Sequence, residues 1–139
     1  MMIRLFEIHL ETTDETDILD ITPQAQEKVL QSGIEDGSML VFISGSTAAV
    51  TTIEYESGVV NDLRRAIDRI APRDIAYEHD RRWGDGNGYS HVRASLLGPS
   101  LLVPVRHKRL LLGTWQQIVL LDFDNRPRRR KVVIQVMGE

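Results

Sequence analysis

The sequence predicts an α+β domain with a mostly antiparallel or mixed sheet and two or three helices. Segments with strand character outnumber helical segments, and few helices stand between consecutive strands, as parallel βαβ units would require. The 139 residues suit one domain that covers 1–139. A hydrophobic content of 42% is ordinary for a chain that folds around a core.

The first segment has the two-residue period of a half-buried strand. In RLFEIHLE (4–11), apolar and polar side chains alternate. The apolar face carries Phe6, Ile8 and Leu10, and the polar face carries Glu7, His9 and Glu11. We therefore expect a strand here, with His9 at the surface.

A short helix and two strands should follow. TPQAQEKVLQSG has Thr22 as an N-cap, Pro23 at the first helical position and Gly33 as the stop. After a turn, the apolar segment 39–44 and the β-branched segment 48–55 are typical of strands. Gly-Ser-Thr separates these two strands.

The next segment is an amphipathic helix that Pro72 ends. Its apolar side chains recur at helical spacing and share one face. They are Val59, Leu63, Ile67 and Ile70. The loop WGDGNG then interrupts regular structure, and 89–98 should form a short helix that stops at Gly98.

Three strand segments complete the chain: SLLVPV (100–105), LLLGTWQQIVLLDF (110–123) and KVVIQVMG (131–138). Pro104 lacks a backbone N–H, so its strand should lie at an edge or bend there. The intervening VRHKRL is typical of a hairpin turn.

Composition excludes several classes of protein. Without cysteine there are no disulfides and no thiolate ligands or nucleophiles. No apolar run reaches the length of a membrane span, and the first residues do not resemble a signal peptide. With a net charge of −3, we expect a cytoplasmic protein with no nucleic-acid and no membrane partner.

The basic run RPRRRK (126–131) has two interpretations. It could be a solvated strand end that faces the acidic neighbours Asp122 and Asp124, or a patch that binds phosphate. We favour the first interpretation, because specific nucleic-acid binding would require a larger basic surface.

His79 and His91 flank the WGDGNG loop. Either the loop is a plain surface turn with histidines at its edges, or it folds back so that the two imidazoles converge. Neutral imidazole is a common metal ligand, and two histidines with a carboxylate make a workable divalent site. Asn87 lies within the loop, where asparagine is ordinary turn chemistry.

Three further segments carry polar groups next to apolar strands. Ser46 and Thr47 could offer hydroxyls and backbone N–H groups to an anion, or simply form a bulge. Glu54, near the end of the following strand, could point into a cleft or to solvent. The third segment, Thr114, Trp115 and Gln116, could be buried core or one wall of a ligand pocket.

An ordered set of motifs resembles the YjbQ family. It comprises TAAVTTIE, an amphipathic helix ending in proline, YEHD, DGNGYSHVRASLLGPS, VPV and LLLGTWQQIVLLDFDNRPRRR. The resemblance extends from about Met39 to Gly138 and implies a compact α+β fold that forms homotrimers. Members are described as secondary thiamine-phosphate synthase-like. Many relatives have histidine where this chain has Gly45.

The resemblance also implies roles for the candidate residues. Glu54, His79 and His91 would be catalytic, with His79 and His91 also binding a divalent metal such as zinc or magnesium. A phosphorylated small molecule would be bound by Ser46, Thr47, Asn87, Thr114, Trp115 and Gln116.

Two functions follow as hypotheses. The protein is a metal-assisted enzyme acting on a phosphorylated small molecule, or a non-catalytic trimeric protein that binds a small molecule or metal. For either, we expect the WGDGNG loop to bring His79 and His91 together, with Glu54 nearby. Glycines at 84, 86 and 88 would allow the positive φ angles of such a reversal.

Overall fold

The computed structural model of the protein describes residues 1–14 and 16–139. Within these residues there are eight strands and four helices. The strands are β1 (Met2–Glu11), β2 (Asp17–Asp20), β3 (Gly37–Ile43), β4 (Ala48–Ile53), β5 (Ser100–Arg106), β6 (Arg109–Leu110), β7 (Gln117–Asp122) and β8 (Arg129–Gly138). The helices are α1 (Thr22–Ser32), α2 (Ser57–Ile70), α3 (Glu78–Trp83) and α4 (Gly88–Leu97).

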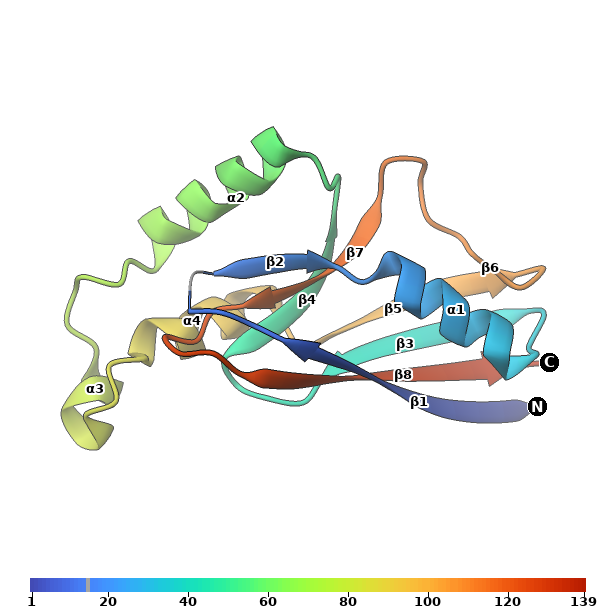
Figure 1. The fold of residues 1–139 in the computed structure, drawn as a ribbon, viewed down its shortest axis with the longest axis horizontal. Helices are drawn as coiled ribbons and strands as arrows, with labels where there is room; N and C mark the ends of the chain where they lie inside the picture. Colours follow the sequence, from blue (N-terminus) through green and yellow to red (C-terminus); the bar gives the residue numbers. More distant parts are fainter. Residues whose placement is uncertain (15) are drawn as a thin grey trace.

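The larger sheet has five antiparallel strands in the order β1-β8-β3-β5-β6 (Figure 1). The alternation seen in the sequence of β1 is confirmed, because Ile8 is buried while Glu7 and His9 are exposed. The outer face of the same strand leaves Ile3 and Leu5 exposed. One face of this sheet therefore forms core, and the other presents apolar side chains to solvent.

The smaller sheet has three antiparallel strands in the order β2-β7-β4. Its central strand β7 is buried on both faces, which explains the unbroken apolar run IVLL. Ile118 and Leu120 face the larger sheet and α1. Val119 and Leu121 face α2 and α4 on the other side. The larger sheet, the smaller sheet with α1, and the pair α2 and α4 thus form successive layers (Figure 1).

Arg93 anchors α4 to the end of α2. Its buried guanidinium donates from Nε to the carbonyl of Ala71 at 2.9 Å and from Nη2 to Asp68 at 2.8 Å. The ring of Tyr89 lies 5.0 Å from the same guanidinium. These contacts fix the position of α4, which carries His91.

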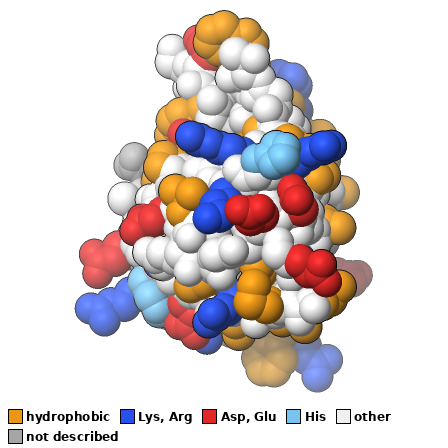
Figure 2. Space-filling view, turned by 90° about the vertical axis from the view of Figure 1, so that its right-hand side faces the viewer, with side chains coloured by type: hydrophobic (Ala, Val, Ile, Leu, Met, Phe, Trp, Pro, Cys, Tyr) orange, Lys and Arg blue, Asp and Glu red, His pale blue; other side chains and the backbone are white. Residues whose placement is uncertain are grey.

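The two ends of the molecule differ in what they carry. The termini and the β5–β6 hairpin lie at one end, whereas α3 and the start of α4 lie at the other (Figure 1). Figure 2 shows the end with the termini, where acidic, basic and apolar side chains are interspersed. None of the helices described is long and apolar enough to cross a membrane.

Several sequence-based expectations need correction. The segment 110–123 is not one strand, because residues 111–116 leave the sheet and only Gln117–Asp122 pairs. Strand β2 and helix α3 were not predicted. α1 begins at Thr22 itself, with Ile21 in the capping position. The stop at Gly33, the helix at 88–97 and the β5–β6 hairpin are confirmed.

Candidate functional site

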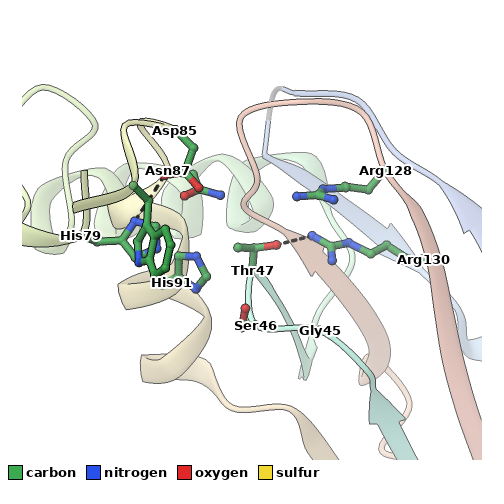
Figure 3. A pocket seen from close by; sticks show the side chains of 10 residues that line it. Gly45, Ser46, Thr47, His79, Asp85, Asn87, His91, Arg128 and Arg130 are labelled. Atoms are coloured by element: carbon green, nitrogen blue, oxygen red, sulfur yellow. Dashed lines mark hydrogen bonds and ion pairs between the residues drawn. The ribbon is translucent and has the colours of Figure 1, made fainter. Parts of the chain in front are cut away.

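A cleft of about 470 Å³ lies where α3 and α4 face the ends of β4 and β8 (Figure 3). Most of its lining residues have polar or charged side chains. The lining residues are Gly45, Ser46, Thr47, His79, Trp83, Asp85, Asn87, His91, Arg128 and Arg130. They come from three separate segments of the chain, 45–47, 79–91 and 128–130, so only the tertiary fold brings them together.

The two histidines converge, as predicted. The ring centroids of His79 and His91 lie 4.5 Å apart, with the ring planes tilted by 41° (Figure 3). His79 comes from α3 and His91 from the first turns of α4. The connecting loop reverses the chain through Gly84 (φ 71°) and Gly86 (φ 70°), which is the left-handed backbone that glycine tolerates best.

Gly88 is required for space, not for positive φ. A Cβ there would lie 2.6 Å from the Cβ of Tyr77 and 3.0 Å from Oδ1 of Asp80. The backbone N–H of Gly88 donates to that Asp80 oxygen at 2.8 Å. The carboxylate of Asp80 thereby joins α3 to the N-terminus of α4, where an anion is favoured.

On one side of the cleft, the lining residues His79 and Asp85 lie close to a further carboxylate, that of Asp80. Nδ1 of His79 is buried and has no hydrogen-bond partner among the described residues. It faces Oδ1 of Asp80 at 3.6 Å and Oδ1 of Asp85 at 3.5 Å. The three side chains can offer ligand atoms that all lie within 4.8 Å of one another. Nitrogen and oxygen ligands of this kind suit zinc or magnesium.

The opposite wall carries two arginines from the chain around the start of β8. Arg130 is 7% exposed and donates from Nε and Nη2 to the two carboxylate oxygens of Asp122, at 2.9 and 3.1 Å. Its Nη2 also donates to Oγ1 of Thr47 at 2.6 Å. A Cβ at Gly45 would lie 2.9 Å from Nη1 of Arg130. The absence of a side chain at position 45 therefore leaves room for this guanidinium.

Asp124 is the buried centre of the network beneath the cleft. It accepts hydrogen bonds from Thr47 at 3.2 Å, from Asn87 at 3.2 Å and from Nε of Arg128 at 2.6 Å. Burial would raise the pKa of Asp124. The hydrogen bonds from Asn87, Arg128 and the backbone N–H of Asn125, together with the charge of Arg128, outweigh burial and hold this pKa below its ordinary value.

The basic run thus has a mixed outcome. The prediction that Asp122 and Asp124 face it is confirmed by the ion pairs with Arg130 and Arg128. The description as a solvated strand end fits Arg129, which is exposed, but is wrong for the buried Arg130. Arg128 and Arg130 also line the cleft.

The candidate substrate residues divide into two groups. Ser46, Thr47 and Asn87 belong to the cleft. Thr47 links Arg130 to the buried Asp124, because its hydroxyl accepts from Arg130 and donates to Asp124. Asn87 donates to Asp124 while its Oδ1 is buried without a hydrogen-bond partner in the described part of the chain.

The other candidates lie at the far end of β4. Glu54 is exposed and follows Ile53, so roughly 20 Å of strand separates it from Thr47. The expectation that Glu54 lies near the histidines is therefore wrong within this chain. Thr114, Trp115 and Gln116 form an exposed turn before β7, so the buried-strand interpretation is wrong as well. Gln116 donates from Nε2 to Oγ1 of Thr52 at 3.1 Å, also at this end.

Sequence reasoning missed five residues of the site: Asp80, Trp83, Asp85, Arg128 and Arg130. Asp80 directly follows His79 in the sequence, and Asp85 lies inside the glycine loop. The acidic residues next to His79 and in the loop were therefore a usable signal. The arginines gave a weaker signal, because nothing local indicates that β8 begins beside Gly45.

Comparisons with known proteins agree with the fold. A sequence model of the family described as "UPF0047 protein YjbQ-like" matches residues 6–139. A UPF0047 protein of Archaeoglobus fulgidus is 38% identical over 131 residues, which covers 94% of this chain and 99% of the relative. The UPF0047 protein YugU of Bacillus subtilis is 34% identical over 132 residues, with 94% and 97% covered.

Solved structures show the same architecture. A YjbQ-like protein of unknown function from Sulfolobus solfataricus superimposes with a TM-score of 0.89 at 29% identity, covering 99% of this chain and 100% of that one. An uncharacterised protein from Clostridium acetobutylicum has a TM-score of 0.87 at 33% identity, with 95% and 99% covered. The two-sheet α+β arrangement is thus shared with these proteins.

Proposed function

This chain belongs to the YjbQ-like UPF0047 family, and from the geometry of its cleft we propose that it is a metal-assisted enzyme that acts on a phosphorylated small molecule in the cytoplasm. The proposed function involves neither a nucleic acid nor a membrane. The observation that carries it is the division of the cleft into an imidazole–carboxylate wall and a guanidinium wall that face each other (Figure 3).

The guanidinium wall supports the phosphate part of the proposal. Arg128 bonds to Asp124 through Nε, and within the described part of the chain its terminal nitrogens remain available for an anion. Arg130 is held rigidly by Asp122 and Thr47, and its Nη1 is directed toward Gly45. Ser46 adds a hydroxyl at the same side of the cleft. A phosphate group would meet donors that are already in place.

The imidazole–carboxylate wall supports the metal part. The residues fit a divalent cation, because the buried Nδ1 of His79 has no hydrogen-bond partner among the described residues and faces Asp80 and Asp85. His79 and His91 are the imidazole ligands expected from the sequence, and the geometry favours His79 with these two carboxylates. When bound, zinc or magnesium neutralises phosphate charge and eases departure of the leaving group.

His91 takes the proton-transfer role in this proposal. Its ring contacts His79 and lies on the cleft surface between the two walls. An imidazole can accept or donate a proton near neutral pH, which suits a general acid or base at a reacting phosphate ester. Asn87 and Thr47 hold the surrounding network in place through Asp124.

Calorimetric titration with zinc or magnesium tests the metal part. We expect wild type to bind one ion per chain, and Asp85→Asn and His79→Ala to weaken binding at least tenfold. Glu54→Gln is the matched control, since Glu54 lies at the far end of β4. Equal affinity in wild type and His79→Ala would refute the metal site.

The finer proposal is a weak thiamine-phosphate synthase activity. In this reaction the ring nitrogen of a thiazole phosphate forms a C–N bond to the methylene carbon of a pyrimidine pyrophosphate, and pyrophosphate leaves as the C–O bond to that carbon breaks. Both substrates carry the phosphate groups that the arginine wall suits. Chromatographic detection of the product, with magnesium present, tests this activity. We expect His91→Ala to lose the product while Glu54→Gln retains it. Equal product from wild type and His91→Ala would contradict the assignment.

We also propose that the protein forms a homotrimer. Exposed apolar side chains support assembly, because monomers rarely present so many. Ile3, Leu5 and Leu102 lie on the larger sheet, and Leu111 and Trp115 lie in the turn before β7. Light scattering at micromolar concentration should give three times the chain mass. A monomer mass would refute this assembly.

The alternative is a non-catalytic protein that binds the same small molecule or metal. The same cleft would serve such a binding protein, which would retain its ligand chemically unchanged. Mass spectrometry of phosphorylated compounds after incubation separates the two functions. Turnover that His91→Ala abolishes, with assembly intact, supports the enzyme, whereas retention without turnover supports the binder.

A further inference from the structure

The cleft does not end at His91. A second groove of about 240 Å³ lies beyond it, between α4 and the chain that enters β4 and β5. The two cavities share Gly45, Ser46 and His91. The remaining lining of the second groove is Ala48, Ala94, Ser95 and Pro99.

The two cavities differ sharply in chemistry. The main cleft contributes the charges of Asp85, Arg128 and Arg130. The lining of the second groove contains no Asp, Glu, Lys or Arg, and methyl or ring carbons form much of its wall. Small residues keep it open: Ala48 and Ala94 are buried, and neither reaches across the space.

We propose that the second groove binds a compact apolar group of the same molecule whose phosphate occupies the main cleft. The ligand class is then a phosphate ester with a small ring or branched alkyl group joined close to the phosphate. His91 lies at the junction, where the bond between phosphate and apolar group would lie. This inference rests on the proposed function, since it takes the phosphate site as given.

The continuity of the two cavities decides the occupant. A separate second ligand would need its own polar contacts, because ligand sites fix orientation with a few placed polar groups. Beyond the shared residues, Ser95 is the one polar side chain in this lining, and its hydroxyl donates to the carbonyl of His91 at 2.8 Å. Orientation must therefore come from the main cleft.

Binding of three probes tests the proposal: inorganic phosphate, methyl phosphate and phenyl phosphate. We expect phenyl phosphate to bind roughly tenfold more tightly than the other two, because burying an aromatic ring removes apolar area from water. Ser95→Phe should fill the groove and remove this preference while the affinity for inorganic phosphate stays unchanged. Ser95 is exposed on α4, so the variant should fold.

Val92→Phe is the matched control, since Val92 is exposed on the same helix but does not line the groove. It should retain the preference for phenyl phosphate. Ser95→Leu, a smaller filling change, should reduce the preference partially. Circular dichroism of each variant should match wild type.

Two outcomes overturn different claims. If none of the probes binds, the proposed phosphate site fails, and this inference fails with it. If inorganic phosphate binds but phenyl phosphate has no advantage, or Ser95→Phe and Val92→Phe act alike, the apolar subsite is refuted while the phosphate site stands.

Discussion

The two ends of strand β4 differ in how far their neighbouring side chains are buried. At the end that precedes Ala48, Thr47 is buried and bonded to Arg130 and Asp124. At the end that follows Ile53, Glu54 is exposed, and the nearby Trp115 is 71% exposed. One end is fixed by a network of buried charges, and the other is open to solvent or to a partner.

The difference shows which end of β4 depends on buried, paired charges. Burying charged groups is costly unless each is paired and hydrogen-bonded, and the cleft end meets this condition for Asp122, Asp124 and Arg130. Donors held in this way need little reorganisation to meet a ligand. The far end needs no such network, because its charges stay in water.

Asp122→Ala should give the largest effect. It removes the partner of the buried Arg130 and leaves an uncompensated guanidinium, at a cost of roughly 3–5 kcal/mol in the free energy of unfolding. Urea denaturation measures this. Glu11→Ala is the matched control, because Glu11 pairs with exposed Arg129 at 3.6 Å. Equal costs for the two variants would erase the contrast between buried and exposed pairs.

Asp124→Asn should cost about 1.5–3 kcal/mol at neutral pH, since it weakens hydrogen bonds to a charged acceptor. The folded-state pKa of Asp124 is held below 3.8, so its contribution is complete above the unfolded pKa and is lost as pH falls through the folded pKa. The stability difference between wild type and variant should therefore shrink below about pH 4. A difference that is constant from pH 7 to pH 2.5 would contradict the lowered pKa.

Gly45→Ala should lower the free energy of unfolding by about 1 kcal/mol, because the added methyl group crowds Arg130 at the cleft end of β4. The new Cβ would lie 2.9 Å from Nη1 of Arg130, whose guanidinium is held by Asp122 and has little freedom to move. At the far end, a Cβ at Gly113 would make only ordinary contacts of 3.6 Å with Gln116. Thermal melts of Gly45→Ala and Gly113→Ala compare the two ends directly, and a more damaging Gly113 variant would reverse the expectation.

Trp115→Ala and Glu54→Ala should have the smallest effects. Each should change the free energy of unfolding by no more than about 0.5 kcal/mol, since both side chains are exposed. Denaturation at the lowest usable protein concentration measures the chain itself. Light scattering of the same samples shows whether Trp115 contributes to assembly instead. A loss of more than 2 kcal/mol in either variant at that concentration would mean that the far end is also structurally essential.

Local patterns predicted much of the fold. The alternation around Ile8 indicated β1, and Gly33 and Gly98 marked helix ends, because each signal depends on a few neighbouring residues. The same local logic failed for 110–123. Apolar residues at 110–112 and 118–121 suggested one strand, but the chain leaves the sheet between them to turn from β6 to β7.

The sequence by itself determined that His79 and His91 could meet. Its glycines at 84 and 86 can adopt the positive φ angles of the reversal between the histidines, and this freedom is a local property of the backbone. Only the tertiary structure decided what the histidines face. Arg128 and Arg130 reach the cleft because β8 begins beside Gly45, and Glu54 is excluded because a full strand separates it from Thr47. Such distances depend on how strands pair across the whole chain, which short-range patterns do not encode.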